Sequence, residues 1–109
     1  MKLYDLSRLQ KTFEGNEALV EKMTQNFLNK TPLMLRELNE HFVQGNLDNV
    51  AQVAHKLKSS IGLMNIKVID DEINIIEKCH VKEISPERLS QLIAKVNYVC
   101  ESVFEQLTR

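Results

Sequence analysis

The stretch VAQVAHKLKSSIGLM, residues 50–64, repeats its apolar side chains at the three- and four-residue spacing of an α-helix. If each residue turns the helix by about 100° and Val50 is placed at zero, five further apolar residues fall within roughly 60° of it. They are Val53, Ala54, Leu57, Ile61 and Met64. This face is predicted to be buried. His55 falls at roughly 140° on the same scale, so the sequence predicts a histidine that points into solvent.

Similar apolar stripes run through the segments on either side of this helix. One extends from Asn16 to about Gln44, one from about Lys67 to Cys79, and one from Pro86 to Leu107. Pro32 lies inside the first of them and predicts a kink, or two helices that meet there with Thr31 as the cap. A shorter stripe covers residues 4–13. Helices are therefore expected along most of the chain.

The connections between these segments are short, and no segment alternates in the manner of a strand. Short connections place consecutive helices antiparallel to each other. With 109 residues, 43% of them hydrophobic, the chain suits a single core. We therefore predict one all-α domain, residues 1–109, folded as an antiparallel up-and-down four-helix bundle with a short N-terminal lid helix.

Charge and composition exclude several classes of function. The net charge is −1 with both signs interspersed, so neither nucleic acid nor an anionic membrane is an expected partner. There is no signal-peptide pattern and no run of about 18 apolar residues, which leads us to expect a cytoplasmic protein. We also expect it to be a monomer. Cys79 and Cys100 lie on apolar stripes outside any paired motif, and we expect them to be buried free thiols.

The outward face around His55 carries mostly short side chains. We call this the short-side-chain patch, and its members are Asp48, Ala51, Ser59 and Gly62. Lys58 falls at about 80°, near the histidine, whereas Lys56 points about 100° away from it. Glycine costs about 1 kcal/mol in a helix relative to alanine, so Gly62 marks a helix end or an approach that needs open space. A solvated surface histidine is the alternative interpretation.

The segment AHKLKSSIGLMNI, residues 54–66, resembles the signature of histidine-containing phosphotransfer (HPt) domains. Five residues match it, namely Ala54, His55, Leu57, Lys58 and Ser60. Residues 13–38 and 45–58 are also similar to the family, in its glycine turn, its long proline-bearing helix and the approach to the histidine. Ser59 stands where the family usually has glycine, and Asn65 stands where many members have a second glycine.

The resemblance implies a carrier that takes a phosphoryl group from the aspartate of one response-regulator receiver domain and passes it to another. His55 would be the phosphorylated residue and Nε2 its nucleophilic atom, with Lys58 stabilising charge on the phosphoryl oxygens. Glu77 stands at the position where the family places a residue that binds the other ring nitrogen. A solvated polar edge shared with Asp70 and Asn74 is the alternative for Glu77. The short-side-chain patch would form the docking surface for the partner.

The sequence contains no phosphate-binding loop, no glycine-rich nucleotide motif and no paired carboxylates typical of a Mg²⁺ site. We therefore expect no enzymatic turnover, cofactor or metal of its own. Mg²⁺ and the aspartate would belong to the receiver domain, and a sensor or hybrid histidine kinase would be a further partner. A docking module, or an HPt relative that does not transfer, is the competing hypothesis. His41 and His80 lack metal-ligand spacing and are expected to be ordinary surface residues.

Overall fold

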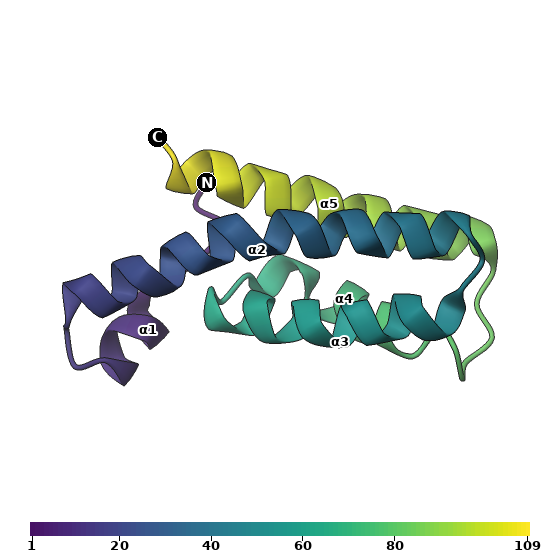
Figure 1. Cartoon of the computed structure of the whole chain (residues 1–109), viewed down its shortest axis with the longest axis horizontal. Coiled ribbons are helices and arrows are strands. Elements are labelled where there is room, and N and C mark those ends of the chain that lie inside the picture. Colours follow the sequence, from purple (N-terminus) through teal and green to yellow (C-terminus); the bar gives the residue numbers. More distant parts are fainter.

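The computed structural model describes all residues, 1–109, and every regular element in it is helical (Figure 1). The order is α1 (Ser7–Thr12), α2 (Glu17–Val43), α3 (Leu47–Leu63), the 3₁₀ turn η1 (Lys67–Ile69), α4 (Asp70–Glu77) and α5 (Pro86–Leu107). The prediction of an all-α chain is confirmed. Helix α2 packs against α3 and α5, α3 packs against α4, and α4 packs against α5. None of these helices is both long enough and apolar enough to cross a membrane.

The three longest helices begin at side-chain caps. The side chain of Asn16 accepts a hydrogen bond from a backbone N–H in the first turn of α2, and Asn46 does the same for α3. Ser85 caps α5, and Pro86 is the first residue of that helix. Between α2 and α3, Gly45 adopts a left-handed backbone with φ of 72°, which lets the chain reverse in a short turn.

Helix α2 continues through Pro32 as a single element and changes direction along its length (Figure 1). Thr31 lies inside this helix and is completely buried, so the alternative of two helices meeting at a Thr31 cap is wrong. A bend is the usual result of proline in a helix, because its nitrogen donates no hydrogen bond and its ring crowds the preceding turn. The fourth predicted helix is shorter than expected. Its first three residues form the 3₁₀ segment η1, and α4, which follows, ends at Glu77.

One continuous core of 23 buried apolar residues holds the helices together. It contains the whole predicted stripe of α3, and also Leu9 from α1. Asn39 of α2 and Asn97 of α5 exchange side-chain hydrogen bonds of 3.3 and 3.0 Å, a polar pair that fixes the register between these two helices. Both cysteines are free and buried, as predicted.

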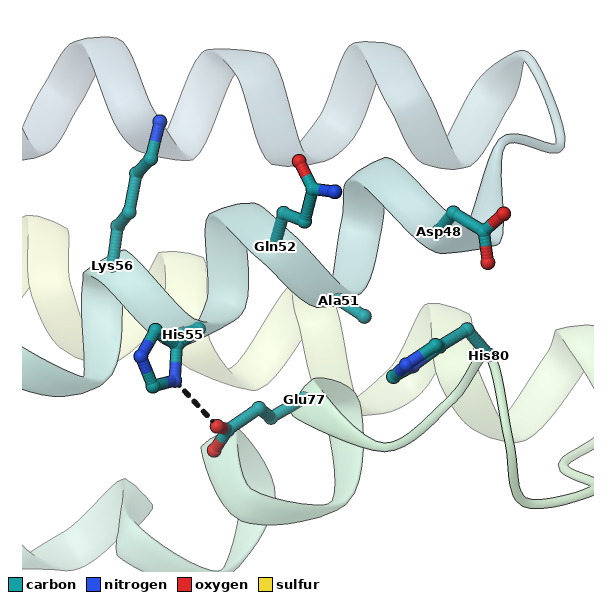
Figure 2. A pocket seen from close by; sticks show the side chains of 7 residues that line it. All are labelled: Asp48, Ala51, Gln52, His55, Lys56, Glu77 and His80. Atoms are coloured by element: carbon teal, nitrogen blue, oxygen red, sulfur yellow. Dashed lines mark hydrogen bonds and ion pairs between the residues drawn. The ribbon is translucent and has the colours of Figure 1, made fainter.

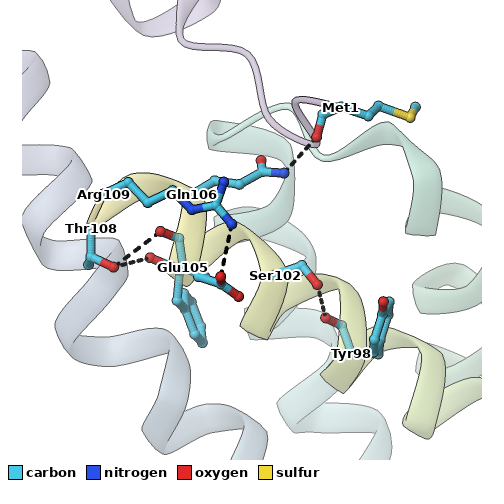
Figure 3. Close-up of polar contacts among 8 residues, drawn as sticks. Met1, Tyr98, Ser102, Glu105, Gln106, Thr108 and Arg109 are labelled. Carbon is cyan, nitrogen blue, oxygen red and sulfur yellow. Dashed lines mark hydrogen bonds and ion pairs between the residues drawn. The ribbon is translucent and has the colours of Figure 1, made fainter.

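The N-terminal segment is held against the last turns of α5 by one side chain. Gln106 donates a hydrogen bond to the carbonyl of Met1 at 2.6 Å and accepts one from the N–H of Leu3 at 3.0 Å. Figure 3 shows Met1 beside this end of α5. The backbone N–H of Asp5 then bonds to the carbonyl of Met64 at 3.0 Å, so the segment also covers the end of α3.

Candidate functional site

The candidate site is built around His55, in the middle of α3. Its side chain is 72% exposed, as the helical spacing predicted. The ring nevertheless has a fixed partner, since Nδ1 lies 2.6 Å from Oε1 of Glu77 at the end of α4 (Figure 2). The side chain of Glu77 is only 20% exposed, so the partner of the ring is mostly covered by the protein. The hydrogen bond fixes one edge of the imidazole and leaves the other edge, with Nε2, without a protein partner.

Lys58 completes a three-residue cluster. Its Nζ lies 3.1 Å from Oε2 of Glu77, so the two carboxylate oxygens each accept from a different side chain of α3. The hydrogen bond with His55, followed by the one with Lys58, holds the pKa of Glu77 below its ordinary value. Glu77 is therefore ionised near neutral pH. An ionised carboxylate only accepts hydrogen bonds, so Nδ1 of His55 is the donor, and in the neutral ring Nε2 carries the free lone pair.

This cluster follows directly from how α3 and α4 pack. His55 and Lys58 are three residues apart and lie on adjacent turns of one helix face. Helix α4 buries Ile73 and Ile76 in the core, and this anchoring places the next residue, Glu77, beside that face. The expected role of Glu77 as a partner of the ring is thus matched by its position, whereas Lys58 is found in an ion pair with Glu77 instead of standing free.

A depression of about 530 Å³ lies beside the histidine, between α3 and the end of α4. Its lining residues are Asp48, Ala51, Gln52, His55, Lys56, Glu77 and His80. Figure 2 shows them coming from α3, from the end of α4 and from the loop that follows it. Both signs of charge line it, together with a single apolar side chain, so it is a polar recess next to the exposed ring.

The short-side-chain patch is divided by His55 into two parts. Asp48 and Ala51 line the depression, whereas Ser59 and Gly62 lie further along α3 and outside it. Ser59 is exposed, and a Cβ added at Gly62 would meet no atom within 4 Å, so this second part is open. The prediction that Ala51 lies on the outward face is wrong. Ala51 is 4% exposed and belongs to the core, because the end of α4 covers this side of α3.

Three residues that line the depression were not predicted from the sequence to belong to the site. His80 comes from an irregular loop, where no periodicity indicates direction, and it was expected to be an ordinary surface residue. Lys56 was set aside on its helical angle, yet it lines the depression, although Figure 2 shows its side chain extending away from Glu77. Gln52 lies three residues before His55, a spacing that could have indicated it. His41 is partly buried on α2 and does not line the depression.

No group of three or more histidine, cysteine or acidic side chains lies close enough together to hold a metal ion. Comparisons with protein-family models, with curated proteins and with solved structures gave no match. The geometry of the site is therefore what bears on function: an exposed imidazole with a free Nε2 is fixed through Nδ1 by a carboxylate, and a lysine binds that carboxylate in turn.

Proposed function

We propose that this chain is a phosphoryl-group carrier of the HPt type, in which His55 accepts a phosphoryl group from the aspartate of a receiver domain and passes it to another. The single observation that carries this proposal is the hydrogen bond from Nδ1 of His55 to Glu77, which leaves an exposed Nε2 as the nucleophile. A histidine that is merely solvated would not be expected to bond to a partly buried carboxylate that a lysine also binds.

The proposed fold is the antiparallel four-helix bundle of that family, formed by α2, α3, α4 and α5, with α1 as a lid. The packing of each of these helices against the next, and of α5 against α2, supports this arrangement. The carrier would act in the cytoplasm as a monomer, between receiver domains and a sensor or hybrid histidine kinase. Mg²⁺ would be bound by the receiver domain.

The chemistry of loading needs only the ring and its partner. The lone pair of Nε2 attacks phosphorus, the Nε2–P bond forms, and the P–O bond to the donor aspartate breaks, so that the aspartate leaves as a carboxylate. The ring then carries a positive charge shared between its nitrogens, and Glu77 accepts the hydrogen bond from Nδ1–H throughout. Approach of the partner is unobstructed because the ring stands out from the surface of α3.

A labelling experiment tests this function directly. A receiver domain phosphorylated with radioactive phosphate is mixed with the chain and Mg²⁺, and the acid-labile label on the chain is measured. We expect label on the wild type, none on His55→Gln, and none on the wild type when ATP alone replaces the receiver. Equal labelling of His55→Gln would overturn the assignment.

The two lysines near the histidine provide a matched comparison. Lys58→Ala is expected to slow transfer with the fold intact, because Lys58 holds the second oxygen of Glu77 and its ammonium is close to the histidine. Lys56→Ala is expected to have a much smaller effect, since Lys56 forms no ion pair. Equal losses from both variants would mean that only the overall positive charge matters.

A docking module that binds receiver domains without transfer is the second candidate. The polar depression beside His55 favours it, because such a recess suits a protruding loop of another protein. The two functions separate in one experiment, in which binding of the receiver is measured by calorimetry alongside the label. Binding without label would select the docking module, and binding with label would select the carrier.

A further inference from the structure

The residue that holds Nδ1 is a carboxylate, and this determines which form of the phosphorylated ring it favours. When Nε2 carries phosphorus, the ring is a cation while Nδ1 keeps its proton, and it becomes neutral when Nδ1 loses it. The carboxylate of Glu77 can accept a hydrogen bond from the cation, but it has nothing to donate to the neutral form. An amide in this place could serve both forms, since its oxygen accepts and its nitrogen donates.

We propose that Glu77 keeps the proton on Nδ1 of the phosphorylated His55, so that the domain holds its phosphoryl group briefly and in a form ready for discharge. This inference rests on the proposed function, which supplies the phosphoryl group. Glu77 is here a positioning residue that acts through the ring. The length of time for which the group is held would thus be set by one side chain of α4.

The balance of the discharge step explains why this proton matters. A carboxylate of the second receiver, or water, attacks phosphorus, the Nε2–P bond breaks, and its electron pair returns to Nε2. If Nδ1 is protonated, the ring leaves as neutral imidazole with its original tautomer restored. If Nδ1 has lost its proton, the ring must leave as an imidazolate anion, which is a far poorer leaving group. A carboxylate that keeps Nδ1 protonated therefore favours rapid transfer over storage.

The geometry gives this role to Glu77 alone. Its Oε1 lies 2.6 Å from Nδ1, and its pKa is held low, so it stays ionised over the whole neutral range. Lys58 fixes the second oxygen at 3.1 Å, which stops the carboxylate from rotating away. The other charged or titratable groups that face this region are Asp48 and Lys56 of α3 and His80 of the loop, and none of them bonds to the ring.

The test measures how long the phosphoryl group survives at different pH values. The chain is loaded with phosphoramidate, a small phosphoryl donor that transfers its group to histidine with release of ammonia, and loss of the group is followed from about pH 6 to about pH 9. The proteins compared are the wild type, Glu77→Gln and the matched control Glu72→Gln. Glu72 is a carboxylate of the same helix that pairs with Lys95 of α5 at 2.7 Å, not with the histidine.

We expect wild type and Glu72→Gln to lose the phosphoryl group rapidly up to a pH about one unit higher than Glu77→Gln does. Near pH 8, Glu77→Gln should therefore hold the group about tenfold longer. This shift is at the low end for a carboxylate partner, because the ring is 72% exposed to solvent. Identical pH profiles for wild type and Glu77→Gln would overturn the inference. An equal change in Glu72→Gln would also overturn it, since general loss of negative charge would then be the cause.

A second measurement covers the case in which Glu77→Gln loads poorly. In the phosphorylated wild type, the 15N chemical shift of Nδ1 distinguishes a protonated from a bare nitrogen. A protonated Nδ1 near pH 8 is the expected result, and a bare one would contradict the proposal. Because phosphoramidate needs no receiver domain, the two hypotheses can fail separately. Different lifetimes without any transfer from a receiver would refute only the proposed function.

Discussion

Replacing Gly62 with alanine is predicted to stabilise the protein. Gly62 is the penultimate residue of α3, its backbone lies outside the left-handed region, and an added Cβ would meet no atom within 4 Å. Alanine therefore fits the folded chain without strain, while it reduces the freedom of the unfolded chain. The gain is about 0.5–1 kcal/mol in the free energy of unfolding, which raises the melting temperature by about 2–6 °C in a domain of this size.

Thermal unfolding followed by circular dichroism measures this change, and Gly45→Ala is its matched control. A Cβ at Gly45 would also meet nothing within 4 Å, but its φ of 72° is unfavourable for alanine. We expect Gly45→Ala to lower the melting temperature, with a loss of roughly 1 kcal/mol. A lower melting temperature for Gly62→Ala would contradict this prediction, because it would show that the glycine is needed for the fold itself.

Larger side chains at the same place test the docking role proposed for this part of α3. Gly62→Gln and Ser59→Arg project from an open surface on the same helix as His55. Ser59→Arg should leave the melting temperature close to that of wild type, and Gly62→Gln should raise it slightly, because glycine is the poorer helix former. Each should weaken binding of a receiver domain and slow transfer, since one intruding group at the centre of a small interface costs well over about 1 kcal/mol. Wild-type binding and transfer by both variants would mean that the docking surface lies elsewhere.

Three further predictions concern stability and the thiols. Leu57→Ala should lower the free energy of unfolding in urea by about 2–5 kcal/mol, because Leu57 is completely buried, and a loss under about 1 kcal/mol would contradict that placement. Burial raises the pKa of Cys100 to about 12 and also raises that of Cys79, so neither thiol should react with a disulfide reagent near pH 8 until the protein is unfolded; rapid reaction of either in the folded protein would disprove this. The pKa of Glu77 is lower in the folded protein than its ordinary value of 4.5. Its pairing with His55 and Lys58 therefore stabilises the fold fully above pH 4.5, and this stabilisation is lost as the pH falls through the lowered pKa. Wild type should therefore be more stable than Glu77→Gln near pH 7, and the difference should shrink as the pH falls below 4.5 and through the lowered pKa; a difference that does not change with pH would count against the ion pairs.

The helices were largely predictable because they carry regular apolar stripes and ordinary caps. The stripe of α3 predicted both the buried face and the outward direction of His55, since both depend only on the local geometry of one helix. Ala51 was misplaced because it lies at about 100° on that helix, between the two faces, where a neighbouring element decides its burial. The spacing along α3 contains no information about how far α4 covers it.

The main residues of the site were predictable from the sequence, but the contacts between them were not. His55, Lys58 and Glu77 were all selected, yet the pairing of Lys58 with Glu77 depends on where α4 ends relative to α3. His80 was missed because its position follows from the path of the loop after α4, which returns along α3. That path is anchored by Cys79, whose thiol lies 3.6 Å from the carbonyl of Leu47, a contact between residues far apart in sequence.

NMR distinguishes the two ring nitrogens of His55, and it therefore tests directly whether Nε2 accepts the phosphoryl group while Glu77 holds Nδ1. The 15N-labelled chain is phosphorylated by a phosphorylated receiver domain with Mg²⁺, and long-range proton–nitrogen spectra of the three histidines are recorded. We expect coupling of phosphorus to Nε2 of His55 alone, with Nδ1 still protonated. Phosphorus on Nδ1 of His55, or on His41 or His80, would contradict it.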